Sequence, residues 1–392
     1  MKSFPIGGVH PSENKLSREQ AIEVLALPDT VTVLLSQHIG APAVAKVAKG
    51  DKVLTGQLIA EAGGFVSSNI HAPISGTVTA VDLTVNGAGL RQPAITIKRE
   101  GDEWAEGIDL SKDIVRECKL ESKEIVAKIQ AAGIVGMGGA TFPAHVKLSV
   151  PPGKKAEFLI INGVECEPYL TSTYRLLMED PAAVINGVKI LLKAIGVRQA
   201  YLAVDDRCLD ALNKLEKLLD GSKMIFGRAV EAQYPMEERT LLCAITGREL
   251  PLGKSAADMG YAVFRAETCA AVFRAFAQGM PYVSRIVTVA GNCVTAPKNV
   301  SVPLGTPIQD LIDYCGGFRK SPACIVLGSP MTGLAVTDTL QLIANALTTV
   351  PTKELQAFLD DYLQKESVER VVVGLPKQMN GQPSQTMPYI EK

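Results

Sequence analysis

The stretch FLIINGVECEPY, residues 158–169, begins with an apolar run typical of a short buried strand and ends in two glutamates and a proline. A helical pattern follows at residues 181–195, with Asp180 as a candidate N-cap. A second strand is predicted at 200–204 and an amphipathic helix at 208–219. Strands that alternate with helices predict a parallel, doubly wound sheet, so we expect a Rossmann-like α/β domain around this stretch.

The same pattern continues on both sides. Apolar residues at helical spacing predict a helix at 125–132, and further helices are expected at 234–247 and 266–279. We therefore assign residues 106–282 to the Rossmann-like domain. At about 150 residues per domain, a chain of 392 residues leaves room for further domains before and after it.

Residues 1–105 predict an all-β domain. The segments GDKVLTGQ (50–57) and HAPISGTV (71–78) resemble the two halves of a biotinyl/lipoyl hammerhead, the barrel-sandwich hybrid fold. Carrier proteins have a lysine at the tip between these halves, but residues 60–70 contain none, so we expect a structural sandwich and not a swinging-arm carrier. The short strands are predicted at 29–35, 52–61, 70–83 and 93–98.

A third block follows the Rossmann-like domain. Strands are predicted at 286–291 and 300–303, followed by a short helix at 307–315. This ββα order suggests a small β-grasp domain, which we assign to residues 283–331. The predicted fold class is therefore a multidomain α/β protein with an N-terminal barrel-sandwich hybrid.

The composition argues against several classes of protein. Forty basic against forty-one acidic residues leave a net charge of −1, so no basic footprint for nucleic acid is visible. The eight cysteines form no CxxC pair, which argues against an iron–sulfur or zinc centre built from local sequence, and we predict no metal site. No apolar run reaches the ~18 residues of a membrane-spanning helix, and the N-terminus lacks a signal-peptide core, so we expect any membrane association to be peripheral.

Two segments carry residues that could hold a ligand. The segment GIVGMGGATFP, residues 133–143, has four glycines within seven positions, which let a backbone approach a ligand closely and present N–H groups to a phosphate. Glu165 and Glu167 follow the strand at 158–162, at the edge where open α/β sheets bind ligands. Both segments also have structural explanations, namely a glycine loop packed against the sheet and carboxylates that cap a helix.

The motifs and their order over residues 1–331 resemble the RnfC family, the peripheral subunit of the Rnf ferredoxin:NAD⁺ oxidoreductase. The middle block is also similar to the flavin-binding NADH subunit of respiratory complex I, and the third block to the β-grasp (SLBB) domain that both proteins share. The motifs that carry the resemblance are GGVHP (7–11), LSQHIGAP (35–42), GDKVLTGQ (50–57), HAPISGTV (71–78), GIVGMGGATFPAHVKL (133–148), NGVECEPYLT (162–171) and RIVTVAG (285–291).

The resemblance implies a peripheral electron-input subunit of an ion-translocating membrane complex. It would lie on the cytoplasmic face of the cell membrane, bound to the other Rnf subunits, and would move electrons between NADH and [4Fe–4S] clusters through FMN. The protein would supply binding and electrostatics, and no residue is assigned a catalytic role. Carried over by position, the cofactor-binding residues are Gly136, Gly138, Gly139, Lys147, Glu165, Glu167 and Glu238.

Several departures from the family keep a second function open. The CxxCxxCxxxCP motifs that hold the family's clusters are missing, so we expect the chain to be unable to complete the electron path alone. Arg265 stands where the family has a small amide donor, Thr173 replaces an aspartate, and only Glu238 remains of a Gly-Gly-Glu stretch. The alternative is therefore a non-catalytic assembly or docking module with a degenerate nucleotide site.

The tail, residues 332–392, is similar to the first part of the YqgF/RuvX family of Holliday-junction resolvases, which have an RNase H-like fold. Metal-dependent cleavage of nucleic acid needs clustered carboxylates, and the strand expected to carry the first of them, at 324–328, has none. We therefore predict neither nuclease activity nor a nucleic-acid partner. The tail's elements are predicted as strands at 334–337, 341–348 and 369–374 and a helix at 353–365.

Overall fold

The computed structural model describes residues 8–336, apart from 87–89, 112–117, 139–140, 150–154, 220, 252 and 323, together with the strand residues 347–348. The chain divides into two compact units, 1–352 and 353–392, and every described residue belongs to the first. Buried hydrophobic residues in this unit form four clusters, two of which lie in the central domain.

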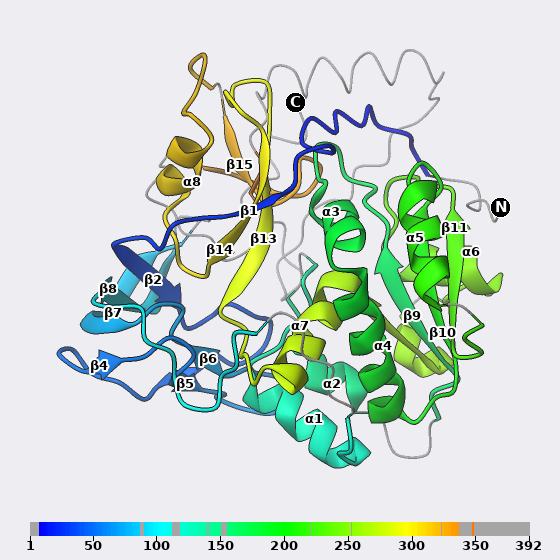
Figure 1. Cartoon of the computed structure of the whole chain (residues 1–392), viewed down its shortest axis with the longest axis horizontal. Helices are drawn as coiled ribbons and strands as arrows, with labels where there is room; N and C mark the ends of the chain where they lie inside the picture. The colour runs from blue at the N-terminus through cyan, green and yellow to red at the C-terminus, as the bar shows by residue number, and fades with distance from the viewer. Residues whose placement is uncertain are drawn as a thin grey trace. The chain divides into compact units, whose positions relative to one another are not determined.

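The central domain is built on a four-stranded, all-parallel sheet with the strand order β11-β10-β9-β12 (Figure 1). The predicted strands at 158–162 and 200–204 are confirmed as β9 and β10. The other two strands were not predicted. The bounds are β9 (Phe158–Gly163), β10 (Ala200–Asp205), β11 (Ile225–Val230) and β12 (Tyr261–Arg265).

Helices cover both faces of this sheet, which is why β9 is apolar at successive positions. Leu159 and Ile161 pack into one hydrophobic cluster, and Ile160, which points to the opposite face, packs into another. The first cluster receives α1 (Ser122–Ala131), α2 (Ala144–Leu148), α3 (Ser172–Glu179), α4 (Pro181–Ile195), α5 (Leu209–Leu219) and α7 (Ala266–Ala277). The second receives α6 (Glu238–Thr246) and the 3-10 helix η1 (Ala256–Met259).

The structure corrects the start of one predicted helix and confirms the predicted N-cap of another. The helix predicted at 234–247 begins only at Glu238, because Tyr234 is extended and exchanges backbone hydrogen bonds with Val9 (2.9 and 2.7 Å). Asp180 is confirmed as the N-cap of α4, since its carboxylate accepts a hydrogen bond from the Ala183 N–H.

Two antiparallel sheets form the N-terminal barrel-sandwich hybrid around a core of their own. The predicted strands at 52–61 and 70–83 each divide into two, because a turn at Gly56 (φ +86°) and the N–H-lacking Pro73 interrupt strand pairing. The sheets are β2 (Thr30–Leu34), β8 (Arg91–Arg99), β7 (Gly76–Val85) and β4 (Lys52–Val53), and β3 (Val44–Ala45), β5 (Leu58–Glu61) and β6 (Ile70–His71).

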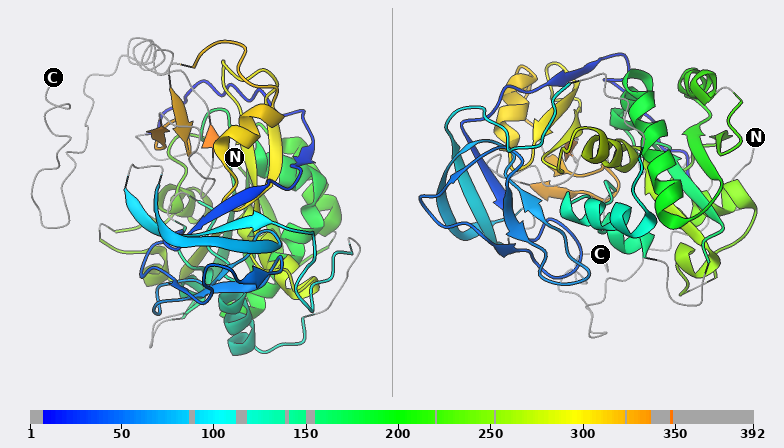
Figure 2. Two further views of the ribbon diagram at one scale, coloured as in Figure 1. Left: turned by 90° about the vertical axis from the view of Figure 1, so that its left-hand side faces the viewer. Right: turned by 60° about the horizontal axis from the view of Figure 1, so that its bottom comes forward.

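The predicted ββα block is present as β13 (Ser284–Val289), β14 (Lys298–Pro303) and α8 (Ile308–Tyr314). A third strand, β1 (Ile22–Val24), pairs in parallel with β14, and both views in Figure 2 show this dark-blue strand beside the yellow ones. Although β1 belongs to the segment 1–105, it completes the β-grasp sheet and not the sandwich, because the exposed edge of β14 offers its backbone groups to it.

The start of the tail packs with the β-grasp domain. Val336, together with Ile325 just before the tail, belongs to the same hydrophobic cluster as residues of β13 and β14. The predicted strand at 334–337 corresponds to β16 (334–336), and the one at 341–348 is described only in its last two residues. The predicted helix at 353–365 and strand at 369–374 lie outside the described residues. The sheet has the order β16-β15-β17, with β15 (Ile325–Leu327), β16 (Leu334–Val336) and β17 (Leu347–Thr348).

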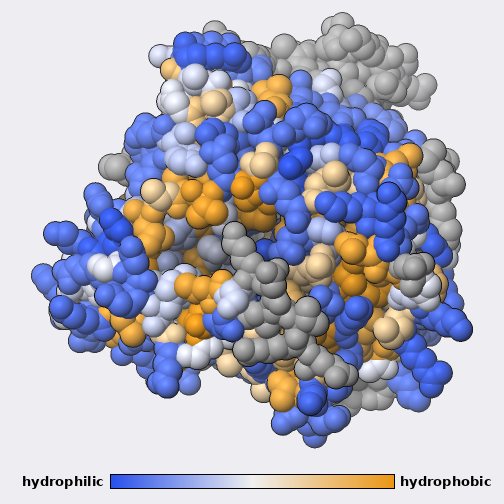
Figure 3. Space-filling view, in the orientation of Figure 1, coloured by the Kyte–Doolittle hydropathy of each residue, from blue (hydrophilic) through white to orange (hydrophobic). Residues whose placement is uncertain are grey.

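Polar residues cover most of the face shown in Figure 3, with hydrophobic residues exposed in smaller patches among them. Among the described residues, no helix combines the length and the hydropathy needed to cross a lipid bilayer.

Candidate functional site

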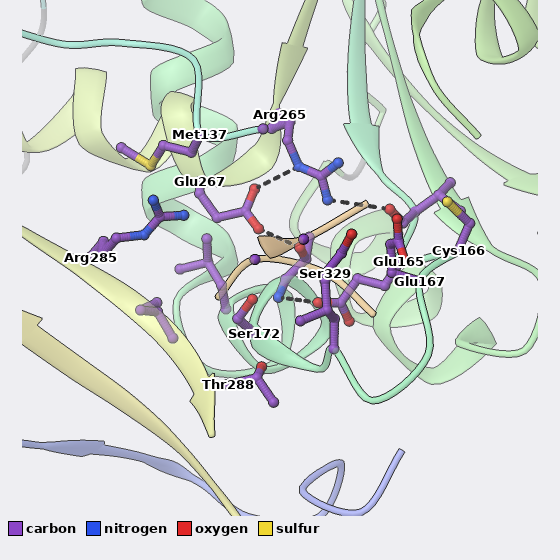
Figure 4. A pocket seen from close by; sticks show the side chains of 18 of the residues that line it. Met137, Glu165, Cys166, Glu167, Ser172, Arg265, Glu267, Arg285, Thr288 and Ser329 are labelled. Carbon is purple, nitrogen blue, oxygen red and sulfur yellow. Dashed lines mark hydrogen bonds and ion pairs between the residues drawn. The ribbon is translucent and has the colours of Figure 1, made fainter. Parts of the chain in front are cut away.

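A cavity of about 300 Å³ opens at the carboxyl ends of β9 and β12, where an open parallel sheet is expected to bind ligands. Its walls come from the glycine loop, the loop after β9, the first turns of α3 and α7, the strand β13, and residues 327–334 (Figure 4). Its lining includes Gly138, Glu165, Glu167, Arg265, Glu267 and Arg285.

Glu165 lines the cavity and caps a helix at the same time. Its two carboxylate oxygens accept hydrogen bonds from the backbone N–H groups of Thr173 (2.7 Å) and Tyr174 (3.2 Å), in the first turn of α3. Burial raises the pKa of Glu165, while the Lys15 ammonium group and the two N–H groups act in the opposite direction. The structural explanation considered for this glutamate, helix capping, is therefore confirmed, and it does not remove the carboxylate from the cavity.

Glu167 faces the segment that closes the cavity on the C-terminal side. Its Oε2 atom accepts a hydrogen bond from the Met331 N–H (3.3 Å). Burial raises the pKa of Glu167, and hydrogen bonds from Ser329 and Met331 oppose this rise. The carboxylate therefore links the central domain to residues 329–331.

Arg265, the last residue of β12, forms a partly buried ion pair with Glu267 in the cavity wall. The Nε atom of Arg265 lies 3.6 Å from Oε2 of Glu267, as the dashed line in Figure 4 marks, and Nη2 donates to the Val164 carbonyl (3.5 Å). The Thr173 hydroxyl donates to the other oxygen of Glu267. Although burial acts to lower it, the pKa of Arg265 is raised by the nearby carboxylates, Glu267 first among them, so the guanidinium keeps its charge.

The glycine loop presents one of its predicted binding glycines to the cavity. The N–H of Gly136 donates to the Phe142 carbonyl (2.8 Å), and the N–H of Met137 donates to the Thr268 hydroxyl (3.1 Å), so both groups are used within the fold. Gly138 lines the cavity, and a Cβ atom built on it would lie 3.4 Å from Cδ of Arg265. Gly139 lies outside the described residues.

Lys147 and Glu238 form a pair of their own. The Lys147 ammonium donates to the Val263 carbonyl (3.0 Å) and lies 3.8 Å from Oε2 of Glu238, whose Oε1 accepts from the Ala256 N–H (3.2 Å). Neither side chain lines the cavity. These two residues therefore do not share the lining of the cavity with Gly138, Glu165 and Glu167.

Cys166, between the two glutamates, has no sign of nucleophilic activation. Burial, more than the neighbouring carboxylates, raises the pKa of its thiol to about 11. The Sγ atom accepts a hydrogen bond from the Met236 N–H (3.3 Å). A thiol in this state remains protonated near neutral pH.

Sequence reasoning missed the contribution of the β-grasp side to this cavity. Arg285 at the start of β13 and residues 327–334 line it, although they are far from the glycine loop in sequence. No local pattern marks these residues, because the fold brings them to the site. Arg265 was singled out in the sequence as a departure from the family, but its pairing with Glu267 was not predicted.

Three domain families match successive parts of the chain. Residues 3–102 match the RnfC barrel sandwich hybrid domain, residues 129–274 the Nuo51 FMN-binding domain, and residues 286–335 the SLBB domain. Residues 323–392 match the Holliday junction resolvase family RuvX, which places the start of that similarity before residue 332.

Two relatives show the extent of the similarity. The chain is 43% identical over 340 residues to the C subunit of the proton-translocating ferredoxin:NAD(+) oxidoreductase complex of Clostridium ljungdahlii, covering 86% of this chain and 73% of that protein. It is 41% identical over 345 residues to the C subunit of the ion-translocating oxidoreductase complex of Rhodobacter capsulatus, covering 86% of this chain and 65% of that protein. Among solved structures, an NAD⁺-reducing nickel–iron hydrogenase matches with a TM-score of 0.49 and 18% identity, over 59% of this chain and 47% of the other.

The succession of these domains defines the class of protein: a multidomain chain built around an α/β domain that matches the Nuo51 FMN-binding domain. Within that class, the chain belongs to the RnfC family, the C subunits of ion-translocating oxidoreductase complexes.

Proposed function

We propose that this chain is the electron-input subunit of an ion-translocating ferredoxin:NAD oxidoreductase complex and that it binds FMN and NADH in the cavity at the carboxyl ends of β9 and β12. One observation carries the proposal: Gly138 of the glycine loop and the carboxylates of Glu165 and Glu167, which are far apart in sequence, line the same cavity. Its volume, about 300 Å³, is at the lower end of the range for small-molecule sites.

The residues present fit a flavin mononucleotide in their chemistry. A phosphate is matched by the Arg265 guanidinium, which presents several N–H donors in a fixed plane, and Gly138 leaves backbone open to a close approach. Glu165 and Glu167 can accept hydrogen bonds from ribose hydroxyls or from a carboxamide. When bound, FMN would supply the redox chemistry, exchanging a hydride with nicotinamide and single electrons with an iron–sulfur acceptor.

The chain's own residues would bind and orient these ligands. In this proposal Gly138, Arg265, Glu165 and Glu167 contact ligand, whereas Gly136, Lys147 and Glu238 support the loop and the strand next to it. Electrons would pass to [4Fe–4S] clusters of the complex, on the cytoplasmic face of the membrane. We expect the other subunits of that complex, and not nucleic acid, to be the partners of the chain.

The test is binding by the purified full chain. We expect a yellow protein that releases FMN on denaturation, takes up added FMN, and bleaches on addition of NADH without oxygen. A colourless protein that binds neither FMN nor NADH in titrations would contradict the proposal.

A second function, a docking module with a degenerate nucleotide site, is favoured by Arg265. Its Cδ atom faces Gly138 and its guanidinium pairs with Glu267, so the side chain fills space beside the glycine loop. Replacing Arg265 with asparagine separates the two functions. FMN binding that appears only in Arg265→Asn would identify a degenerate site, whereas weaker binding in the variant than in the wild type supports the phosphate contact.

A further inference from the structure

A single lysine side chain joins the N-terminal segment to the loop that carries both glutamates. The ammonium group of Lys15 donates hydrogen bonds to the backbone carbonyl oxygens of Glu165 (2.8 Å), Glu167 (2.9 Å) and Leu170 (2.8 Å). An ammonium group has three N–H donors, so each of them has a partner here. Two of the three carbonyls belong to the residues whose carboxylates line the cavity.

The same segment holds this loop at two further points. The N–H of Tyr169 donates to the Glu13 carbonyl (2.8 Å), and the hydroxyls of Ser17 and Thr171 are hydrogen-bonded to each other (2.7 Å). Tyr169 is buried and has a φ of +64°, a left-handed conformation that is uncommon for residues other than glycine. The loop therefore adopts a shape that it would not keep without outside contacts.

The positive charge of the ammonium group also offsets the mutual repulsion of the three carbonyl oxygens. Three carbonyl dipoles point their negative ends at one position, and a buried cation between them stabilises that arrangement. Burial lowers the pKa of Lys15, and the Glu165 carboxylate acts in the opposite direction. In return, the charge of Lys15 limits the rise in the pKa of Glu165 that burial causes.

We propose that Lys15 is a positioning residue of the ligand site: its ammonium group gathers the carbonyls of residues 165, 167 and 170 and so directs both glutamate side chains at the cavity. The part of this inference that concerns ligand binding rests on the proposed function. The geometry of the loop can be tested without any ligand.

The first experiment measures amide hydrogen exchange in the full chain without ligand. In Lys15→Ala, we expect exchange across residues 163–174 to be faster by about tenfold or more, with the amides of β10 unchanged. Lys52→Ala is the matched control, because the Lys52 side chain is exposed and its ammonium group forms a loose surface ion pair, at 3.9 Å, with the carboxylate of Glu100. We expect it to match the wild type.

Chemical rescue separates the loss of the ammonium group from general damage. n-Propylammonium replaces the atoms that Lys15→Ala removes beyond Cβ, so its addition should restore slow exchange at 163–174 and have no effect on Lys52→Ala. If Lys15→Ala folds only when refolded with n-propylammonium, the inference is supported; failure to fold even then overturns it. Unchanged exchange in the variant, or equal acceleration throughout the central sheet, also overturns it.

The second experiment measures FMN affinity over a range of pH. We expect Lys15→Ala to bind FMN at least about tenfold more weakly than the wild type. We also expect the pH dependence of its FMN affinity to shift to higher pH, because Glu165 loses the neighbouring charge that lowers its pKa. n-Propylammonium should reverse both changes. Wild-type protein that binds no FMN, together with the local exchange pattern above, would disprove the proposed function and leave the role of Lys15 in the loop standing. A variant with wild-type affinity would overturn the positioning role.

Discussion

The two lysine–glutamate arrangements near β9 and β12 have similar compositions but different places in the fold. Glu165 and Glu167, held by Lys15, are on the loop that leaves the carboxyl end of β9, and both line the cavity. Lys147 and Glu238 are on α2 and α6, and their pair is bonded to the backbone of Val263 and Ala256. The same residue types therefore line the cavity where they follow the end of a strand, and lie away from its lining where they sit on α2 and α6.

The largest expected effect comes from closing the cavity at the glycine loop. In Gly138→Trp, the indole would occupy space beside Arg265, and we expect FMN affinity to fall by about a hundredfold or more, which is about 3 kcal/mol. Gly138→Ala should lower the affinity less, since its Cβ would make only a van der Waals contact with Arg265, at 3.4 Å. Titration with FMN decides: equal affinity in Gly138→Trp and wild type would place the flavin elsewhere.

Glu165 should matter to stability as well as to binding, unlike a residue that only contacts ligand. Glu165→Ala removes the acceptor for two N–H groups of α3, and loss of such a cap lowers the free energy of unfolding by about 1–2 kcal/mol. Glu165→Gln keeps one carbonyl acceptor and should retain most of the stability. Urea unfolding of both variants measures this, and a Glu165→Ala curve that overlays the wild-type curve would refute the capping role.

The Lys147–Glu238 pair should contribute to the stability of the fold and not to FMN affinity. Lys147→Met leaves the Val263 carbonyl without its donor, and we expect the free energy of unfolding to fall by about 1 kcal/mol. FMN affinity should stay within about twofold of the wild type. A loss of affinity comparable with that of Gly138→Trp would show that the pair belongs to the ligand site after all.

The smallest effect is a dependence of stability on pH. Burial raises the pKa of Glu167 in the folded protein, so the native state holds this proton more tightly than the unfolded state does. This contribution is present below the ordinary glutamate pKa, about 4.3, and is lost as the pH rises through the raised value. The free energy of unfolding of the wild type, relative to Glu167→Gln, should therefore fall across that window, and a constant difference would argue against a raised pKa.

Sequence patterns predicted the elements whose boundaries are marked locally. The helix α4 was predicted at its observed bounds, because Asp180 and Pro181 start it and Gly196, in a left-handed conformation, ends it. The strand β12 was missed, since it continues into α7 without a turn residue between Arg265 and Ala266. Pairing of β1 with β14 also escaped prediction, because a three-residue strand far from its partner has no local signal.

In the candidate site, too, the residues with a local sequence signal were predicted and those without one were missed. The glycine loop and the two glutamates were predicted because glycine spacing and a strand end are local features, and Gly138, Glu165 and Glu167 do line one cavity. Lys147 and Glu238 were assigned to the same site; they lie on α2 and α6 and are not among the residues that line this cavity. Lys15 was not singled out, since nothing around it in sequence indicates a role in a loop 150 residues away.

The amino-acid sequence alone determined the kinds of layer in this protein, because side-chain periodicity and turn residues act over a few neighbouring positions. Its motifs, by their resemblance to a known family, also indicated the family and the segments proposed to bind a nucleotide. Only the tertiary structure decided which charged groups meet. Lys15, Glu165, Arg265 and Met331 come from four distant segments, and their contacts depend on how the β-grasp strands and the N-terminal segment pack against the ends of the parallel sheet.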